Sequence, residues 1–401
     1  MRRSLASAMT VARPFRDRAD ACPGALQTHA AADGALARVR VPGGMLTVTQ
    51  LTALSAAARE LGDGALELTS RGNVQLRGLR PGAEMLLGDR LAAAGLLPSA
   101  THETARNVLA SVLSGRTGGL VDVRSWVPAF DAGLCADPAL ADLPGRFLAA
   151  FDDGRGDVAG LAADVGLLAL DTRTVALLLA GTDTGLRTTP DGAVALALAA
   201  TRGFLAERAA QGGTAWRVAE LVEGPTRIAA ALGDSRQEPV AVPAAPLGGP
   251  AGAVAQDDGR TALVAVVPLS RLTADQADLL AATVVTDLQV TPWRSVVVPD
   301  LADAAAAGAL TTAGLVLDTG SPWLRVTTCA GRPGCAKSLA DVRTDASHAV
   351  ATDTLPSDGA AQHWAGCERR CGRPRGAVVD VVATGVGYRI DLPHQGVENR
   401  S

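Results

Sequence analysis

Lysine is almost absent from the chain. Lys337 is the single lysine, so arginine carries nearly all of the positive charge. The formal net charge is -4 at pH 7, and 19% of the residues are charged. Proteins that bind nucleic acids show a basic balance or a basic stripe, so we expect no nucleic-acid partner. A site for an anion would have to come from a local group of arginines.

Long apolar runs are also missing. A membrane helix needs about 20 consecutive apolar residues, and the longest candidates, such as Val175–Ala180, end quickly in glycine, threonine and aspartate. Near the N-terminus, Arg13, Arg16 and Arg18 interrupt what would be the apolar core of a signal peptide. We therefore expect a cytoplasmic protein without a membrane span, beginning with a disordered lead-in over residues 1–16.

Cysteine is scarce as well, with six residues in 401, too few for a disulfide-stapled fold. Four of them form two pairs near the C-terminus. Cys329 and Cys335 are separated by five residues, and Cys367 and Cys371 by three. Four thiolates are the number that a [4Fe–4S] cluster requires. The two cysteines outside these pairs are Cys22 and Cys135.

The spacing within each pair bears on the kind of site. Residues four apart on a helical turn share one face, about 5–6 Å apart at Cβ, which predicts that Cys367 and Cys371 reach the same cluster. Two alternatives remain open. Structural zinc prefers pairs with two to four intervening residues, so the five-residue spacer between Cys329 and Cys335 speaks against zinc. Disulfides are rare in a reducing compartment.

The chain repeats one pattern. Residues 35–79 show a strand-like run, a helical run and a second strand, and residues 261–301 show the same order. This predicts strands at 37–41, 66–79, 262–268 and 288–298, and helices at 49–61 and 272–282.

The two copies also correspond at single positions. Thr69 aligns with Thr291, and the turn that follows holds Arg71 in the first copy and Trp293 and Arg294 in the second. The repeat predicts a pseudo-twofold protein. An α/β stretch over residues 95–234 separates the copies.

The rest of the chain has a simpler organisation. Residues 235–258, rich in proline, alanine and glycine, are expected to be a linker. Residues 316–401 form a C-terminal α/β segment that carries the cysteine pairs. Within the α/β stretch, helices are expected at 193–210 and 216–232, and a hairpin turn at 181–185.

Three arginines are candidate anion ligands. Arg71 and Arg106 each stand before an asparagine or a glycine–asparagine pair, and Arg146 follows Leu143-Pro-Gly. A guanidinium group donates two parallel hydrogen bonds to a carboxylate and keeps its charge. Taken singly, each arginine fits a solvated surface charge. Together with the cysteines, they indicate a site for an anion beside a cluster.

These residues resemble a known family. The stretches TCAGRPGC and HWAGCERRCGRP resemble the cluster motif of the siroheme-dependent sulfite and nitrite reductases, and LTSRGNVQL and ARNV resemble their arginine motifs. The resemblance spans roughly residues 15–392. It implies an α+β fold with pseudo-twofold symmetry, in which duplicated ferredoxin-like halves, at 17–90 and 259–315, join α/β lobes at 95–234 and 316–401.

The resemblance also implies roles for single residues. Cys329, Cys335, Cys367 and Cys371 would hold a [4Fe–4S] cluster, with Cys371 nearest a second iron centre. Arg71, Arg106 and Arg146 would be the catalytic arginines facing the bound tetrapyrrole or anion. Arg369, with Arg71 and Arg106, would bind the tetrapyrrole.

One departure from the reductases matters. They carry two basic residues at the segment that matches residues 143–148, whereas this chain keeps Arg146 and has Leu148 in the second place. Anion reduction needs proton donors there. The chain is more similar to a branch of the superfamily, the precorrin-3B synthases, in its ACPGAL, RVRVPGG and TPWR stretches.

That branch implies a different chemistry. Precorrin-3A would be the substrate, dioxygen would hydroxylate its C20, and a γ-lactone would close in aerobic cobalamin biosynthesis. The implied cofactors are the [4Fe–4S] cluster and a mononuclear non-haem iron, with electrons from an NADH-linked reductase. The five histidines give no ligand set for that iron, and His363, beside the cluster motif, fits a structural role. A siroheme-dependent sulfite or nitrite reductase remains the alternative.

Overall fold

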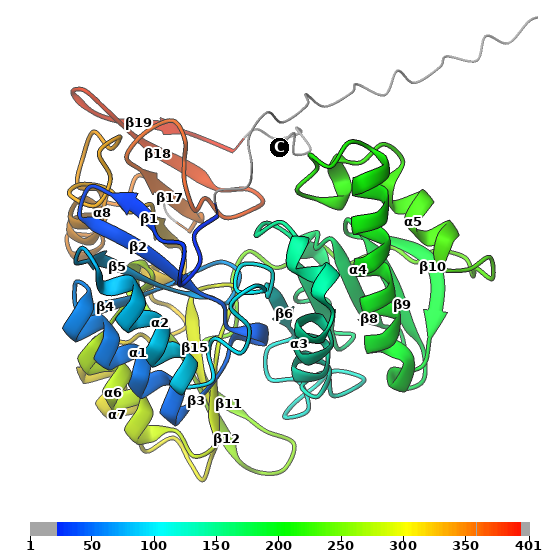
Figure 1. Cartoon of the computed structure of the whole chain (residues 1–401). Helices are drawn as coiled ribbons and strands as arrows, with labels where there is room; N and C mark the ends of the chain where they lie inside the picture. Colours follow the sequence, from blue (N-terminus) through cyan, green and yellow to red (C-terminus); the bar gives the residue numbers. More distant parts are fainter. Residues whose placement is uncertain (1–21, 358, 394–401) are drawn as a thin grey trace, which may run out of the picture.

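The structure is a computed structural model that describes residues 22–357 and 359–393, so the expected lead-in at 1–16 lies outside the described residues. Four sheets with covering helices build the molecule (Figure 1). The α+β class predicted from the sequence is confirmed. No helix within the described residues combines the length and apolar character needed to cross a bilayer.

The first sheet is antiparallel and belongs mainly to the first copy of the repeat. Its strand order is β1-β2-β5-β4-β13. Helices α1 (Val48–Leu61) and α2 (Ala83–Ala93) accompany it. The strands are β1 (His29–Ala31), β2 (Gly34–Val39), β5 (Val74–Leu79), β4 (Ala65–Leu68) and β13 (Arg271–Thr273).

The second sheet repeats this arrangement with the second copy. Its order is β11-β12-β15-β14-β3. Helices α6 (Ala274–Thr283) and α7 (Ala307–Thr312) accompany it. The strands are β11 (Gly252–Ala255), β12 (Thr261–Val266), β15 (Ser295–Leu301), β14 (Asp287–Val290) and β3 (Met45–Thr47).

Each half donates one edge strand to the other half's sheet. Strand β3 of the first copy pairs with β14, and β13 of the second copy pairs with β4. The following helices start in the same way, because Thr47 and Thr273 each form a capping box with the glutamine three residues on. Both halves share one hydrophobic core. The predicted pseudo-twofold symmetry is therefore present down to single hydrogen bonds.

Each predicted second strand is a hairpin rather than a single strand. Residues 66–79 divide into β4 and β5, and residues 288–298 divide into β14 and β15. The turn between the strands needs one residue with positive φ. Gly72 supplies it in the first copy (φ +65°) and Arg294 in the second (φ +62°). The apolar residues before and after the turn fall on positions of the same parity, Leu66 and Leu68 before it and Val74 and Leu76 after it, so periodicity alone did not separate the two strands.

The lobe between the copies is built on a mixed sheet of order β10-β9-β8-β7-β6, in which β6, β7 and β8 are parallel. It lies to one side of the paired halves (Figure 1). Its elements are β6 (Val108–Ala110), β7 (Ala149–Asp152), β8 (Val165–Ala169), β9 (Val175–Leu179), β10 (Thr182–Thr188), α3 (Trp126–Ala136), α4 (Ala193–Ala210) and α5 (Gly224–Leu232).

Three expectations for this region need correction. The predicted helix at 216–232 begins only at Gly224, where Pro225 occupies the first turn, and a short 3-10 helix precedes it. The hairpin turn is Ala180–Gly181, both with positive φ, so that residues 182–185 already belong to β10. Residues 252–255 of the expected linker form β11, which pairs with β12.

The C-terminal lobe contains the cysteine pairs. Its sheet has the order β16-β17-β18-β19, and the first three strands run parallel. The lobe lies over the first half (Figure 1). Its elements are β16 (Val326–Thr328), β17 (Gln362–Ala365), β18 (Val379–Thr384), β19 (Gly387–Asp391) and α8 (Val342–Ala351).

Candidate functional site

Parallel pairing explains why distant cysteines meet. Cys329 directly follows β16, and Cys367 lies two residues beyond the end of β17. These strands are adjacent and parallel, so their carboxyl ends share one edge of the sheet. The Cys329 amide donates to the carbonyl of Trp364 at 3.0 Å, which extends the strand pairing to the cysteine itself.

The loop of Cys335 interlocks with the loop of Cys367. The Leu339 amide donates to the Gly366 carbonyl at 2.8 Å, and the Gly366 amide donates to the Cys329 sulfur at 3.2 Å. A Cβ atom on Gly366 would lie 1.8 Å from the Ser338 hydroxyl oxygen. Only glycine at position 366 therefore allows the two loops to come this close. In this arrangement the Gly366 amide points at the Cys329 sulfur.

The four thiols lie within electrostatic reach of one another. Burial raises the pKa of Cys371, the Arg369 charge opposes that shift, and the charges of Cys329, Cys367 and Cys335 add to it. All four are free thiols. No three His, Cys, Asp or Glu side chains in residues 22–357 and 359–393 are placed to hold a single metal ion. The structure thus brings both pairs together, while the cluster ligation stays a prediction.

The local conformation of the second pair differs from the expected helical turn. The Arg370 amide donates to the Cys367 carbonyl at 3.1 Å, and the Arg373 amide donates to the Arg370 carbonyl at 3.1 Å. Arg370 has a φ of +45°, which breaks any helix. Its side chain pairs with Asp391 on β19 at 2.7 Å, and this ion pair holds the two successive turns against the sheet.

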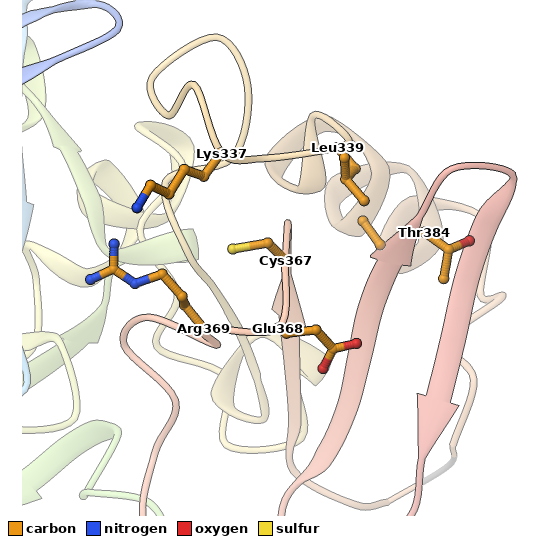
Figure 2. Close-up of a pocket in the computed structure, with 7 residues that line it drawn as sticks. Lys337, Leu339, Cys367, Glu368, Arg369 and Thr384 are labelled. Atoms are coloured by element: carbon orange, nitrogen blue, oxygen red, sulfur yellow. The ribbon is translucent and has the colours of Figure 1, made fainter.

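An open pocket lies beside Cys367. Its volume is about 460 Å³. Figure 2 shows the Cys367 sulfur pointing to the same side as the Lys337 ammonium and the Arg369 guanidinium, away from Glu368. The predicted tetrapyrrole ligand Arg369 thus stands beside a candidate cluster ligand. The lining residues are Lys337, Leu339, Cys367, Glu368, Arg369, Ala383 and Thr384.

Arg71 belongs to a larger group of arginines. It lies in the β4–β5 turn, and its pKa is lowered to about 10 by burial and by the Arg217 charge, which Asp164 partly offsets. The pKa of Arg40 is lowered to about 9 by burial and by Arg38. Partial burial and the Arg217 charge also lower the pKa of Arg375. We call this group the arginine cluster: Arg38, Arg40, Arg71, Arg217 and Arg375.

The arginine cluster gathers side chains from three parts of the chain. Arg71 comes from the first half, Arg217 from the lobe between the copies and Arg375 from the segment just after Cys371. The buried Nη1 of Arg40 finds no hydrogen-bond partner among the described residues. A buried donor without a protein partner suits the carboxylate of a bound ligand.

Arg106 has a different environment from Arg71. It is 4% exposed, forms two hydrogen bonds to Asp131 at 2.7 and 2.8 Å, and donates to the Leu96 carbonyl at 3.0 Å. The structure therefore does not bring it to the arginine cluster, and its contacts indicate a structural role. The ARNV pattern could not show this, because Asp131 lies on α3, far away in sequence.

The asparagines of the two arginine motifs have a role that the sequence did not reveal. The Asn73 side-chain amide donates to the Asn107 side-chain oxygen at 2.9 Å, and Asn107 donates to the Gly145 carbonyl at 3.0 Å. Asn73 also accepts from the Val41 amide at 2.9 Å. The pair joins the first half to the neighbouring lobe. The available signal in the sequence was that Asn73 and Asn107 each follow an arginine closely and each precede a valine.

Arg146 and Leu148 differ in exposure, although they stand two residues apart. Arg146 is exposed, and its guanidinium lies 5.3 Å from the ring centroid of Trp216, next in sequence to Arg217. Leu148 is 4% exposed and packs in an apolar cluster with Leu109, Ala150, Val158 and Ala163. An apolar side chain thus occupies the position where the resemblance to the reductases implies a second basic residue.

Other members of the arginine cluster were only partly visible in the sequence. Arg38 and Arg40 stand two apart in a strand-like run, and that spacing places both on one face. No sequence pattern singled out Arg217 or Arg375 as members of the cluster. Their partner Asp164 is 1% exposed and has a pKa raised by burial, while Arg217 and the amides of Val218 and Leu148 counteract that shift.

His363 lies beneath the cysteine loops. It is fully buried, its Nδ1 lies 3.0 Å from the Thr327 hydroxyl, and its pKa is lowered to about 3 by burial and by the charge of Arg294. The imidazole is therefore neutral at physiological pH. These contacts agree with the structural role expected from the sequence.

Part of the chain matches a known protein family, and most of its length is similar to a known protein. The nitrite/sulfite reductase ferredoxin-like half domain family matches residues 29–93, from β1 to the end of α2. A precorrin-3B synthase of Sinorhizobium sp. is 28% identical over 387 residues, which cover 92% of this chain and 82% of that protein. Over residues 29–93 the chain thus resembles one half domain of the nitrite and sulfite reductases, and over most of its length it resembles a precorrin-3B synthase.

Two further proteins are similar to the chain. A ferredoxin–nitrite reductase of Synechococcus elongatus is 34% identical over 127 residues, or 30% of this chain and 25% of that enzyme. The structure of the NirA protein of Mycobacterium tuberculosis superposes with a TM-score of 0.71 at 20% identity, covering 89% of this chain and 74% of that one. The superfamily fold predicted from the sequence is thereby confirmed.

Proposed function

We propose that this homologue of precorrin-3B synthase is an oxidoreductase that hydroxylates precorrin-3A with dioxygen. The observation that carries the proposal is the arginine cluster, which Arg375 joins four residues after Cys371. Burial, together with the charges of neighbouring arginines, lowers the pKa of Arg40, Arg71 and Arg375. The cluster therefore gathers positive charge in a partly buried place, where Asp164 is the acidic partner of Arg217. A polycarboxylate tetrapyrrole is a ligand that would supply negative charge there.

The residues of the site fit a [4Fe–4S] cluster and a tetrapyrrole, the two groups that the resemblance to the reductases implies. Cys329, Cys335, Cys367 and Cys371 would hold a [4Fe–4S] cluster, for which the Gly366 amide directed at sulfur is a typical support. Such a cluster supplies single electrons when bound. The segment from Cys371 to Arg375 connects the thiols to the arginine cluster, so the tetrapyrrole and the cysteines would be neighbours.

The roles of the protein's own groups follow from their positions. Arg71, Arg40 and Arg217 would bind and orient carboxylates of the macrocycle, and Arg369 and Lys337 would do so beside Cys367. Buried Leu148 leaves no proton donor at its position, which suits binding of the substrate better than multi-proton reduction of an anion.

The proposed reaction balances with one external reductant. One oxygen atom of dioxygen would add at C20 and the ring A acetate oxygen at the adjacent ring A carbon, so that the double bond between these two carbons is consumed and the γ-lactone closes. The acetic acid proton would pass to the new C20 hydroxyl. The other oxygen atom would leave as water with two electrons and two protons, and an NADH-linked reductase would deliver the electrons. A mononuclear non-haem iron belongs to the same proposal, without ligands assigned among the histidines.

Anaerobic purification separates the proposal from the reductase alternative. We expect iron and acid-labile sulfide in a ratio typical of one cluster, no extractable siroheme, and consumption of dioxygen only with precorrin-3A and an electron donor. Extracted siroheme, together with sulfite or nitrite consumption in the absence of dioxygen, would contradict the proposal and establish the reductase. The similarity to a nitrite reductase makes this comparison necessary.

Replacing Arg71 by alanine is expected to weaken tetrapyrrole binding. One charge-assisted hydrogen bond contributes about 1.5–3 kcal/mol, so affinity should fall roughly tenfold to a hundredfold. Binding of uroporphyrin, a stable polycarboxylate tetrapyrrole, can be followed by its absorption. The matched control is Arg80→Ala, which removes an exposed arginine from the same half. Equal affinities of the two variants would show that Arg71 does not contact the macrocycle.

A further inference from the structure

The two hairpin turns of the repeat have the same hydrogen bonds but different residues at one position. In the first copy the Gly72 amide donates to the Thr69 carbonyl at 3.1 Å. In the second, the Arg294 amide donates to the Thr291 carbonyl at 3.0 Å. Gly72 and Arg294 therefore occupy equivalent positions, both with positive φ. Glycine adopts this conformation without penalty and arginine does not, so the second copy keeps a side chain at a conformational cost.

The Arg294 side chain is directed to the cysteine loops. It is 9% exposed, and its Nη2 donates to the Gly372 carbonyl at 2.6 Å. Gly372 directly follows Cys371 and has a φ of +81°. The hydrogen bond thus ties the hairpin turn of the second half to the last cysteine of the C-terminal lobe.

The charge of Arg294 lacks an acidic partner. No Asp or Glu in the described parts of the chain forms an ion pair with it, and burial alone lowers its pKa to about 10. A buried charge is costly unless a counter-charge or several hydrogen bonds compensate for it. One neutral carbonyl is weak compensation. A negatively charged group at Cys371 would complete the environment of this guanidinium.

We propose that Arg294 is a positioning residue of the cysteine site, which holds the loop after Cys371 and sets a positive charge behind it. This inference rests on the proposed function in one respect, because it needs a [4Fe–4S] cluster on the four cysteines. A fixed positive charge favours the more negative, reduced form of a nearby redox centre. Arg294 should therefore raise the reduction potential of the cluster.

The equivalence with Gly72 supplies a variant that suits the backbone. Arg294→Gly removes the side chain and recreates the turn of the first copy, so the hairpin should form without strain. Arg294→Lys keeps the charge but loses the planar guanidinium. The control is Arg325→Met, which removes an exposed charge just before β16, at the end of the strand opposite Cys329.

Redox titration of the purified, cluster-loaded proteins, followed by visible absorption and electron paramagnetic resonance, measures the effect. For Arg294→Gly we expect the reduction equilibrium to shift about tenfold toward the oxidised form, which is 59 mV for one electron. Arg294→Lys should lie between this variant and the native protein, and Arg325→Met should equal the native protein. Resonance spectra of the reduced cluster should change only for the Arg294 variants.

The outcomes separate this inference from the proposed function. If the native protein holds no cluster, the proposed function fails. If all proteins hold the cluster and Arg294→Gly keeps the native potential and spectrum, only the role of Arg294 is overturned. Loss of the cluster from Arg294→Gly with native circular dichroism supports the positioning role, whereas unfolding of both Arg294 variants contradicts it by making the residue a requirement of the fold.

Discussion

Replacing Cys367 by serine is expected to abolish the visible absorption of the purified protein and to remove its iron and acid-labile sulfide. The serine hydroxyl is a poor substitute for a thiolate at a cluster. The Cys367 loop also carries Gly366, whose amide is directed at the Cys329 sulfur. Anaerobic purification followed by absorption spectroscopy and iron and sulfide analysis measures the effect.

The control for this experiment is Cys135→Ser. Cys135 packs beside the core of the lobe between the copies, and burial raises the pKa of its thiol. We expect this variant to keep the full iron and sulfide content. A Cys367→Ser protein with native absorption, or a Cys135→Ser protein without it, would refute the assignment of the four ligands. Zinc without sulfide in the native protein would favour the structural zinc site instead.

Replacing Asp131 by asparagine is expected to destabilise the lobe by about 3 kcal/mol, because the buried Arg106 guanidinium would lose its counter-charge. Arg106 is 4% exposed, and the Asp131 side chain is 16% exposed. Urea denaturation followed by tryptophan fluorescence reports on this lobe, since Trp126 is buried beside Phe151 in its core.

A surface ion pair serves as the comparison. Glu60 pairs with Arg90 between two helices, with side chains that are 56% and 31% exposed. Glu60→Gln should change the free energy of unfolding by no more than about 0.5 kcal/mol. If Asp131→Asn has an equally small effect but weakens uroporphyrin binding, Arg106 belongs to the tetrapyrrole site after all, as its motif suggested.

The repeat and the cysteine pairs could be predicted from the sequence because both leave local patterns. Alternating apolar residues located the strands, and the flanking residues of Cys329 and Cys367 are distinctive. The conformation of Cys367 to Cys371 could not be predicted from spacing, since the ion pair between Arg370 and Asp391 depends on how β19 returns to the sheet.

The different surroundings of the arginines could not be predicted from their sequence motifs. Arg71 and Arg106 looked alike in the sequence, each close to an asparagine. Only the position of Asp131 on a later helix distinguishes them, by pairing with Arg106. Arg217 and Arg375 left no local signal, because their contribution arises from three separate parts of the chain meeting at one place.

The reciprocal exchange of β3 and β13 has a consequence for biosynthesis. The first sheet cannot gain its last strand until Arg271–Thr273 have left the ribosome, so the β4 edge of the nascent first half stays unpaired while the whole intervening lobe is made. An unpaired edge is a site for misassociation between chains. The intervening lobe has its own core and can fold during this delay, so completion of the first half is a late event in translation.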